Sequence, residues 1–249
     1  MRVYNLSNET IQRWQWGDPL MRHLTDMVLA LAQGLGGRAL DVGAGTGRVA
    51  VALARRGFQV DALDPAADVV EQARALMTQL GANVTYHVAD FTRVDPRFQE
   101  NTFDLVVCSE VLEHVEAWRA MVDNMRRVLK PNGILILTVP NDPAQFSFLD
   151  TYAGHLRRFR WNDLASAFGG FKIEKSFTVG FPLTRTVHWL YTRILLPVVY
   201  REHRPDRMWQ NGTMYRGIGS QVLYAAIRAD DLFNGLRWGT TWVVKARKV

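Results

Sequence analysis

The sequence is poor in the features that mark secreted and membrane proteins. Its 249 residues include a single cysteine, Cys108, so no disulfide can form within the chain. No apolar run approaches the roughly 18–20 residues of a membrane-spanning helix; the best candidate, Ile194–Tyr200, is far shorter. The first residues, Met1–Glu9, lack the basic and apolar segments of a signal peptide. We therefore expect a cytoplasmic protein without a transmembrane segment.

Charge is unevenly distributed along the chain. The net charge is +6, yet residues 1–150 carry 14 Lys and Arg against 18 Asp and Glu, whereas residues 151–249 carry 16 against 6. A basic second part suits an anionic ligand, a membrane surface or nucleic acid, and it also suits a merely solvated basic face. With 48% hydrophobic and 22% charged residues, the composition is that of an ordinary globular protein with a buried core.

Apolar strands alternate with amphipathic helices from residue 18 to about residue 140. This order predicts a doubly wound α/β fold, with a mostly parallel sheet and helices on both faces. Asp18 and Pro19 provide the cap and the first-turn proline of the first helix. The later elements are expected at Ala39–Val42, Val49–Arg56, Gln59–Leu63, Ala66–Leu80, Asn83–Val88, Phe103–Ser109, Ala117–Leu129, Ile134–Val139, Asn162–Phe168, Lys172–Thr178 and Thr240–Ala246.

About 60 residues separate the last two predicted strands, too many for a hairpin, so we expect an insertion there. The chain then divides into a core with an N-terminal helical segment (residues 1–180), the insertion (181–237) and the final core strand (238–249). One apolar stripe in the insertion predicts a helix that packs on the core, closes over a ligand site as a lid, or lies on a membrane surface. It comprises Val187, Leu190, Tyr191, Ile194, Leu195 and Val198.

A glycine-rich turn joins the first predicted strand to the next helix. Asp41–Gly47 reads D-V-G-A-G-T-G, at the carboxyl end of a strand, where open α/β sheets bind ligands. A dinucleotide fingerprint requires the spacing G-x-G-x-x-G, and its third glycine is replaced here by Arg48. The observed spacing therefore argues against a nicotinamide enzyme.

Acidic residues end the next two predicted strands. Asp64 ends the second strand, where a carboxylate can accept hydrogen bonds from both hydroxyls of a ribose. Asp90 ends the third, where it can accept a bond from an adenine amino group, with Phe91 or Leu63 against the ring face. A glycine turn and two acids at successive strand ends predict an adenosine-containing ligand.

With these motifs the sequence resembles the class I S-adenosylmethionine (SAM) dependent methyltransferases. The resemblance rests on D-V-G-A-G-T-G, L-D-P at Leu63–Pro65, A-D-F at Ala89–Phe91, F-D-L-V-V-C-S-E-V-L-E-H-V at Phe103–Val115, and L-K-P-N-G at Leu129–Gly133. It implies a Rossmann-like, seven-stranded sheet with an antiparallel last strand, and SAM as cofactor. The residues it implies for cofactor binding are Asp41, Gly43, Gly45, Gly47, Asp64, Pro65, Asp90, Phe91 and Ser109.

An acidic run, Glu110-Val111-Leu112-Glu113-His114, begins where the fourth predicted strand ends. Two carboxylates and an imidazole this close could chelate a divalent cation such as Mg²⁺, with His155 as a further ligand. The run is similar to that of the ubiquinone-biosynthesis O-methyltransferases and of the small-RNA terminal methyltransferases. This resemblance implies Glu110, Glu113, His114 and His155 as ligands of a metal, and the metal in turn holds two neighbouring hydroxyls. Relatives without a metal imply instead a catalytic role for Glu110, Glu113 and His114, or packing alone.

The leading interpretation is therefore an enzyme that methylates a hydroxyl of a small molecule. The apolar stripe, Trp189 and Trp209 favour a hydrophobic, lipid-linked or glycosidic acceptor and peripheral contact with a membrane. Trp14 and Trp16 either close over SAM or anchor the N-terminal segment.

Two alternatives stay open. One is a nucleic-acid methyltransferase, favoured by Arg157, Arg158 and Arg160 but lacking an aromatic and basic binding platform. The other is a SAM-binding protein without transfer activity. Lone histidines usually pack or face solvent, so His188 and His203 receive no role.

Overall fold

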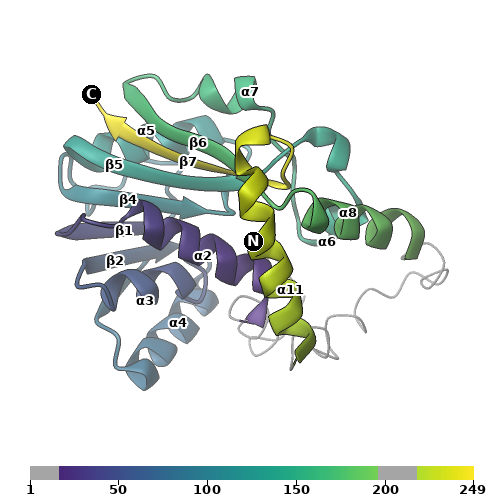
Figure 1. The fold of residues 1–249 in the computed structure, drawn as a ribbon. Coiled ribbons are helices and arrows are strands. Elements are labelled where there is room, and N and C mark those ends of the chain that lie inside the picture. Colours follow the sequence, from purple (N-terminus) through teal and green to yellow (C-terminus); the bar gives the residue numbers. More distant parts are fainter. Residues whose placement is uncertain (1–16, 196–217) are drawn as a thin grey trace.

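The computed structural model of the protein describes residues 17–195 and 218–249. One sheet contains seven strands in the order β3-β2-β1-β4-β5-β7-β6, and β7 runs antiparallel to both of its neighbours (Figure 1). The strands are β1 Arg38–Val42, β2 Gln59–Asp64, β3 Val84–Val88, β4 Phe103–Ser109, β5 Leu129–Pro140, β6 Phe171–Val179 and β7 Thr241–Lys248. The predicted doubly wound α/β fold with an antiparallel last strand is confirmed.

Helices cover both faces of this sheet (Figure 1). One face packs against α2, α3 and α4, and the other against α5 and α7. Their bounds are α2 Pro19–Leu31, α3 Arg48–Ala54, α4 Ala67–Leu80, α5 Trp118–Val128 and α7 Trp161–Ala165. Because the central strands are buried on both sides, they consist of nearly continuous apolar runs, such as Ile134–Leu137 in β5. The predicted cap of α2 is present, since the Asp18 carboxylate accepts hydrogen bonds from the backbone of Leu20 and Met21.

Two predicted boundaries were wrong. β5 begins at Leu129, well before the predicted Ile134, because Leu129 already pairs with Phe103 across an irregularity in the register. Helix α7 is shorter than predicted, and its N-cap is Arg160 instead of Asn162. Its first residue, Trp161, packs on the indole of Trp242 in β7 with 4.9 Å between ring centroids, which sets where the helix begins.

The segment between β6 and β7 folds back onto the core. It contains α8 (Leu183–Leu190), a wider helical turn η3 (Tyr191–Leu195), α11 (Ile218–Ala229) and η5 (Asp230–Leu236). Helix α11 lies along α2 (Figure 1), where the Tyr224 hydroxyl donates a hydrogen bond to Asp26. The buried carboxylate of Asp230 accepts bonds of 2.8 Å from the backbone N–H groups of Leu183 and Thr184, so it caps α8. The start of α8 is therefore fixed by a residue from the far end of the insertion.

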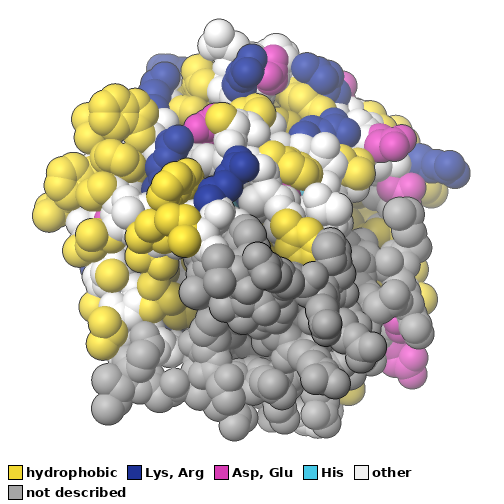
Figure 2. All heavy atoms as spheres, turned by 90° about the vertical axis from the view of Figure 1, so that its right-hand side faces the viewer, with side chains coloured by type: hydrophobic (Ala, Val, Ile, Leu, Met, Phe, Trp, Pro, Cys, Tyr) yellow, Lys and Arg dark blue, Asp and Glu magenta, His cyan; other side chains and the backbone are white. Residues whose placement is uncertain are grey.

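Three residues of the apolar stripe of the insertion have described side chains, and these three do not pack on the core. Val187, Leu190 and Ile194 are 53%, 45% and 50% exposed, which overturns the prediction of a core-packed helix for these positions. Figure 2 shows hydrophobic side chains gathered beside Lys and Arg on the face that carries α8. Within residues 17–195 and 218–249, no helix is long and apolar enough to cross a membrane. The predictions made for Trp14, Trp16, Val198, His203 and Trp209 lie outside the described residues.

Candidate functional site

The glycine turn after β1 has a backbone that only glycine fits well. Gly43, Gly45 and Gly47 have φ angles of +70°, +53° and +94°, in the region that side chains disfavour. A Cβ atom on Gly43 would also lie 2.6 Å from a methyl group of Val111. The turn therefore lies flat against the segment that follows β4, and its backbone is open to a ligand.

A cavity of about 290 Å³ lies beside this turn, at the carboxyl ends of the strands. It is bounded by the glycine turn, the start of α2, the acidic run, α6 (Phe148–Tyr152) and α8. Of the predicted site residues, those that line it are Asp41, Gly43, Ser109, Glu110, Glu113, His114 and His155. The cavity thus joins the predicted cofactor side to the predicted metal ligands.

Asp41 and Arg48 form the buried base of the cofactor side. Burial raises the pKa of Asp41 from 3.8 to about 7, although the nearby Arg48 guanidinium partly opposes this shift. Arg48 is held in place by hydrogen bonds to the Met21 carbonyl, at 2.5 Å, and to the Thr25 hydroxyl. Arg48 therefore joins the end of the glycine turn to helix α2.

Asp41 should make the stability of the protein depend on pH. Between pH 3.8 and about 7 the folded protein holds a proton that the unfolded chain has lost, so the free energy of unfolding falls as pH rises. The slope from this one group approaches about 1.4 kcal/mol per pH unit. We expect Asp41→Asn, which stays neutral, to flatten the curve obtained by urea denaturation across this range. The exposed Asp163→Asn is the control, and equal slopes in all three proteins would contradict the assignment.

Asp64 braces the glycine turn from the end of β2. One carboxylate oxygen accepts a hydrogen bond from the Gly45 N–H at 3.2 Å, and the other accepts one from Ala66 at 3.0 Å. Burial raises the pKa of this carboxyl, and the two backbone bonds oppose the rise. Pro65 is exposed and leads the chain into α4.

The predicted adenine side is less complete. Asp90 is exposed, and its carboxylate accepts hydrogen bonds from the Thr92 amide and hydroxyl. The ring of Phe91 is 1% exposed and packs edge-on against Phe98 in the core. Asp64, Pro65, Asp90 and Phe91 do not line the cavity described above. The roles predicted for Asp90 and Phe91 beside an adenine ring stay predictions, and ring contact by Phe91 requires a movement of its side chain.

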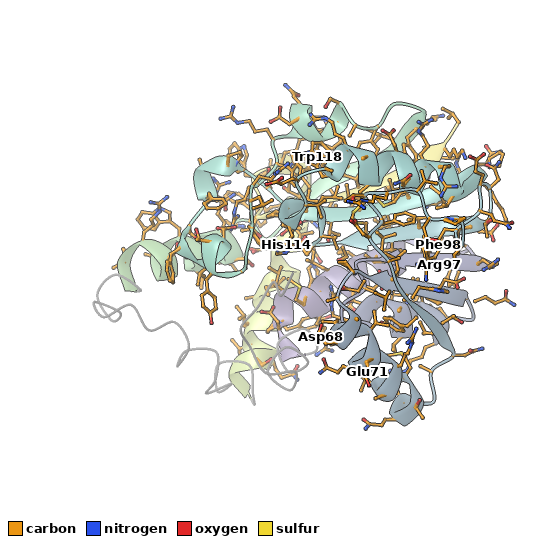
Figure 3. The ribbon with its side chains drawn as sticks, turned by 180° about the vertical axis from the view of Figure 1, so that it is seen from behind. Asp68, Glu71, Arg97, Phe98, His114 and Trp118 are labelled. Atoms are coloured by element: carbon orange, nitrogen blue, oxygen red, sulfur yellow. The ribbon has the colours of Figure 1, made fainter. Side chains whose placement is uncertain are left out.

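The acidic run turns sharply out of the sheet. Glu110 takes a left-handed conformation, with φ of +58°, directly after β4, and the short helix η1 (Leu112–His114) follows. The Glu113 side chain is fully buried, and among the described residues neither of its carboxylate oxygens has a hydrogen-bond partner. One of these oxygens lies 3.8 Å from His114 Nε2 and 3.9 Å from His155 Nε2. Figure 3 shows His114 on this segment, between the sheet and helices α6 and α8.

Both imidazoles are held so that Nε2 faces Glu113. His114 Nδ1 donates to the Gly154 carbonyl at 3.1 Å, and His155 Nδ1 donates to Asp150 at 2.9 Å. Asp150 is itself buried and accepts bonds from Arg158. Histidines that donate through one ring nitrogen and direct the other toward a carboxylate are typical of metal sites.

None of the three side chains of this cluster, Glu113, His114 and His155, carries a permanent positive charge. Burial raises the pKa of Glu113 well above its usual value, and the nearby Glu110 raises it further. Burial lowers the pKa of His114 to about 4, and His155 adds to this shift. The ligand atoms of Glu113, His114 and His155 lie within 4.8 Å of one another, so these residues fit a divalent cation. Glu110 lines the cavity but lies outside this group of three.

Several residues that line the cavity were given no site role by the sequence analysis, and His188 is the one among them with a titratable ring on the insertion. His188 of α8 lines the cavity together with Thr184 of the same helix. The one available signal was its place opposite the apolar stripe, which did not identify the surface it would face. Arg158, considered above as a nucleic-acid contact, instead holds Asp150 with two hydrogen bonds.

Comparisons with known sequences identify the same part of the chain. A sequence model of the methyltransferase domain family matches residues 40–137. The ubiquinone biosynthesis O-methyltransferase of Xanthomonas axonopodis pv. citri (strain 306) is 36% identical over 134 residues, which are 53% of this chain and 56% of that enzyme. The enzyme of the same name from Xanthomonas oryzae pv. oryzae (strain PXO99A) is 37% identical over the same shares. The chain thus spans about half the length of the curated relatives it matches.

Solved structures extend the likeness to nearly the whole chain. The cyclase SpnF aligns over 92% of this chain and 80% of its own, with a TM-score of 0.63 and 25% identity. Phosphoethanolamine N-methyltransferase 2 of Haemonchus contortus, in complex with SAM, aligns over 97% of this chain and 57% of its own. Its TM-score is also 0.63 at 19% identity, which shows a shared fold.

Proposed function

Because the chain contains a class I SAM-dependent methyltransferase domain, we propose that it methylates one of two neighbouring hydroxyls on a small, largely apolar molecule. A divalent cation bound by Glu113, His114 and His155 would assist the transfer. The observation that carries the proposal is the buried Glu113 carboxylate, which has no hydrogen-bond partner in the described part of the chain and which the Nε2 atoms of His114 and His155 face. Transfer to oxygen is supported by the name of the similar O-methyltransferases.

The cofactor side of the cavity suits SAM, which supplies a methyl group on a positively charged sulfur. At its glycines, the turn has no side chains that would keep the cofactor away from its backbone, and the Asp64 carboxylate lies beside this turn. Arg48 holds the end of that turn against α2. These residues align the methyl group with the acceptor, and such positioning can supply roughly 7–11 kcal/mol of the barrier.

The acceptor side suits a molecule with two adjacent oxygens. A divalent cation such as Mg²⁺ would lower the pKa of hydroxyls that it binds. Glu113 supplies the negative charge that a cation needs, and the two imidazoles supply neutral nitrogen atoms. Asp150 and the Gly154 carbonyl fix both rings, so the chain holds this arrangement before any ligand arrives.

An apolar acceptor fits the surroundings of the cluster. Leu149, Tyr152 and Ala153 line the cavity, and the exposed face of α8 lies on the outside of the same helix as His188. We propose that the insertion acts as a lid over the acceptor and that its exposed apolar side chains touch a membrane peripherally, from the cytoplasmic side. A nucleic-acid acceptor has less support, because Arg158 is engaged within the protein.

The proposed function predicts metal-dependent turnover of a catechol. Purified protein with SAM and Mg²⁺ is expected to methylate 4-dodecylcatechol, and excess EDTA should reduce the rate by at least roughly 100-fold, since metal assistance is worth several kcal/mol. Product formation is followed by mass spectrometry. The monomethyl ether of the same compound is the matched control acceptor and should not react.

Three outcomes would contradict parts of this proposal. Equal turnover with EDTA would exclude the metal. Turnover of the monomethyl ether at the same rate would exclude recognition of two hydroxyls. SAM binding without transfer to any compound in a cell metabolite extract would favour a protein that binds SAM but does not use it for methylation.

A further inference from the structure

An acceptor hydroxyl must lose its proton during methyl transfer, and the proposed ligands cannot take it. His114 and His155 each donate through Nδ1, to Gly154 and Asp150. Their remaining lone pairs, on Nε2, are directed to the position where a cation would lie beside Glu113. With a cation bound, neither ring has a free lone pair. Another group in the cavity must therefore accept the proton.

His188 has the required position. It lines the same cavity as Glu113, His114 and His155, but it comes from the insertion. Its helix is fixed at the start by Asp230, and the Thr192 hydroxyl donates to the His188 carbonyl at 2.8 Å. Its Nε2 atom is shielded from water and has no hydrogen-bond partner among residues 17–195 and 218–249. A buried ring nitrogen without a partner is costly, which indicates that a ligand group completes it.

The surroundings of His188 keep its imidazole unprotonated, so that a lone pair is available. Burial lowers the pKa of His188 to about 4, the nearby Arg158 lowers it further, and Asp150 opposes the shift. Asp150 is in turn bonded to both Arg158 and His155, so the three groups form one connected set. The imidazole is therefore neutral at neutral pH. In the tautomer with the proton on Nδ1, the lone pair lies on the shielded Nε2.

We infer that His188 is a catalytic residue, whose Nε2 takes the proton of the acceptor hydroxyl as the methyl group is transferred. The acceptor oxygen forms a bond to the methyl carbon while the carbon–sulfur bond breaks, and the electron pair of that bond stays on sulfur. The products are the methyl ether and S-adenosylhomocysteine, and the proton on His188 later passes to solvent. This inference rests on the proposed function. Glu110 is the competing base in the cavity, since one of its buried oxygens also lacks a partner.

A binding experiment tests the inference without turnover. The probe is 4-nitrocatechol, whose visible absorbance changes when a hydroxyl ionises, added to holoprotein containing S-adenosylhomocysteine and Mg²⁺. We expect the wild type to ionise the bound probe at a lower pH than His188→Gln does, by about 1 pH unit or more. Val187→Ala, on the exposed side of the same helix, should match the wild type. Glu110→Gln should shift the ionisation by less than His188→Gln does, and the reverse order would assign the proton to Glu110 and overturn the inference.

Turnover supplies the second readout. His188→Gln should lower kcat by roughly 100-fold at neutral pH, as general bases typically contribute 10²–10⁴-fold. This loss should shrink as pH rises and the acceptor ionises unaided, while SAM affinity stays within about 2-fold. A His188→Gln variant that keeps the wild-type rate and probe ionisation overturns this inference alone, as does a loss that is equal at every pH. A wild type that neither binds nor methylates any catechol overturns the proposed function and the inference with it.

Discussion

Asp64→Ala is expected to bind SAM roughly 30- to 1,000-fold more weakly than the wild type. The Asp64 carboxylate accepts hydrogen bonds from Gly45 and Ala66, which places it at the edge of the glycine turn with lone pairs left for a ribose. The substitution removes both the brace of the turn and the acceptor for the hydroxyls. Hydrogen bonds to charged groups are worth about 1.5–3 kcal/mol each, so the combined loss should reach about 2–4 kcal/mol. Isothermal titration calorimetry with SAM and with S-adenosylhomocysteine measures the loss.

Asp61→Ala is the matched control for this experiment. Asp61 lies on the same strand, but within the described residues its carboxylate pairs with Arg38 and His87, each at 2.9 Å, whereas that of Asp64 accepts a bond from the glycine turn. It should therefore bind SAM as the wild type does. Equal binding by wild type, Asp61→Ala and Asp64→Ala would mean that Asp64 does not contact the cofactor. No binding by a folded, cofactor-free wild type would point to a nucleotide ligand of another kind.

The cofactor half of the fold could be predicted because its signals are local. Each central strand is buried on both faces and appears as an apolar run, and each helix carries one apolar side. Gly43 and Gly47 have a left-handed backbone that glycine adopts most easily. The spacing of the glycines in the sequence therefore indicates where the turn lies. Such features depend on near neighbours in the chain, so the motif and the element order are sufficient to predict them.

The acceptor half could be predicted only in part, because its geometry depends on distant contacts. The run Glu110–His114 predicted a cluster with His155, but not that Glu110 would lie outside the group of three. Glu110 takes a left-handed conformation directly after β4, which the sequence does not indicate. His188 reaches the cavity because Asp230, far along the chain, caps α8. Periodicity predicted which residues share a side of that helix, and long-range packing decided which side faces inward.

Glu113→Gln is expected to change stability in opposite directions with and without metal. In the metal-free protein, Glu113 is a fully buried carboxyl without a hydrogen-bond partner, and the nearby Glu110 adds repulsion. Glutamine is close to it in shape and carries no charge. Because the folded wild type must hold this carboxyl protonated against its usual pKa and glutamine avoids that cost, the substitution should raise the free energy of unfolding by about 1–3 kcal/mol at neutral pH. Urea denaturation of metal-free wild type and variant measures this difference.

The effect should depend on pH in a defined sense. The pKa of Glu113 in the folded protein lies well above its usual value of 4.5, so the folded state keeps a proton that the unfolded chain loses. The metal-free wild type should therefore lose stability as pH rises above about 4.5, and Glu113→Gln should lose less. Glu174→Gln is the control, because Glu174 is exposed and pairs with Arg247 on the surface.

Adding a divalent cation should reverse the order of the two proteins. A cation at 1,000 times its Kd stabilises the form that binds it by about 4.1 kcal/mol, which exceeds the expected advantage of the metal-free variant. Glu113→Gln lacks the charged ligand and should gain little. Methyl transfer should fall by roughly 100-fold or more in the variant, since even residues that only orient metal ligands contribute 10–100-fold. If Glu113 served packing alone, the substitution would change the free energy of unfolding by the same amount with and without the cation. If Glu113→Gln is destabilised to the same extent in both conditions, Glu113 is a structural residue and the cluster does not bind metal.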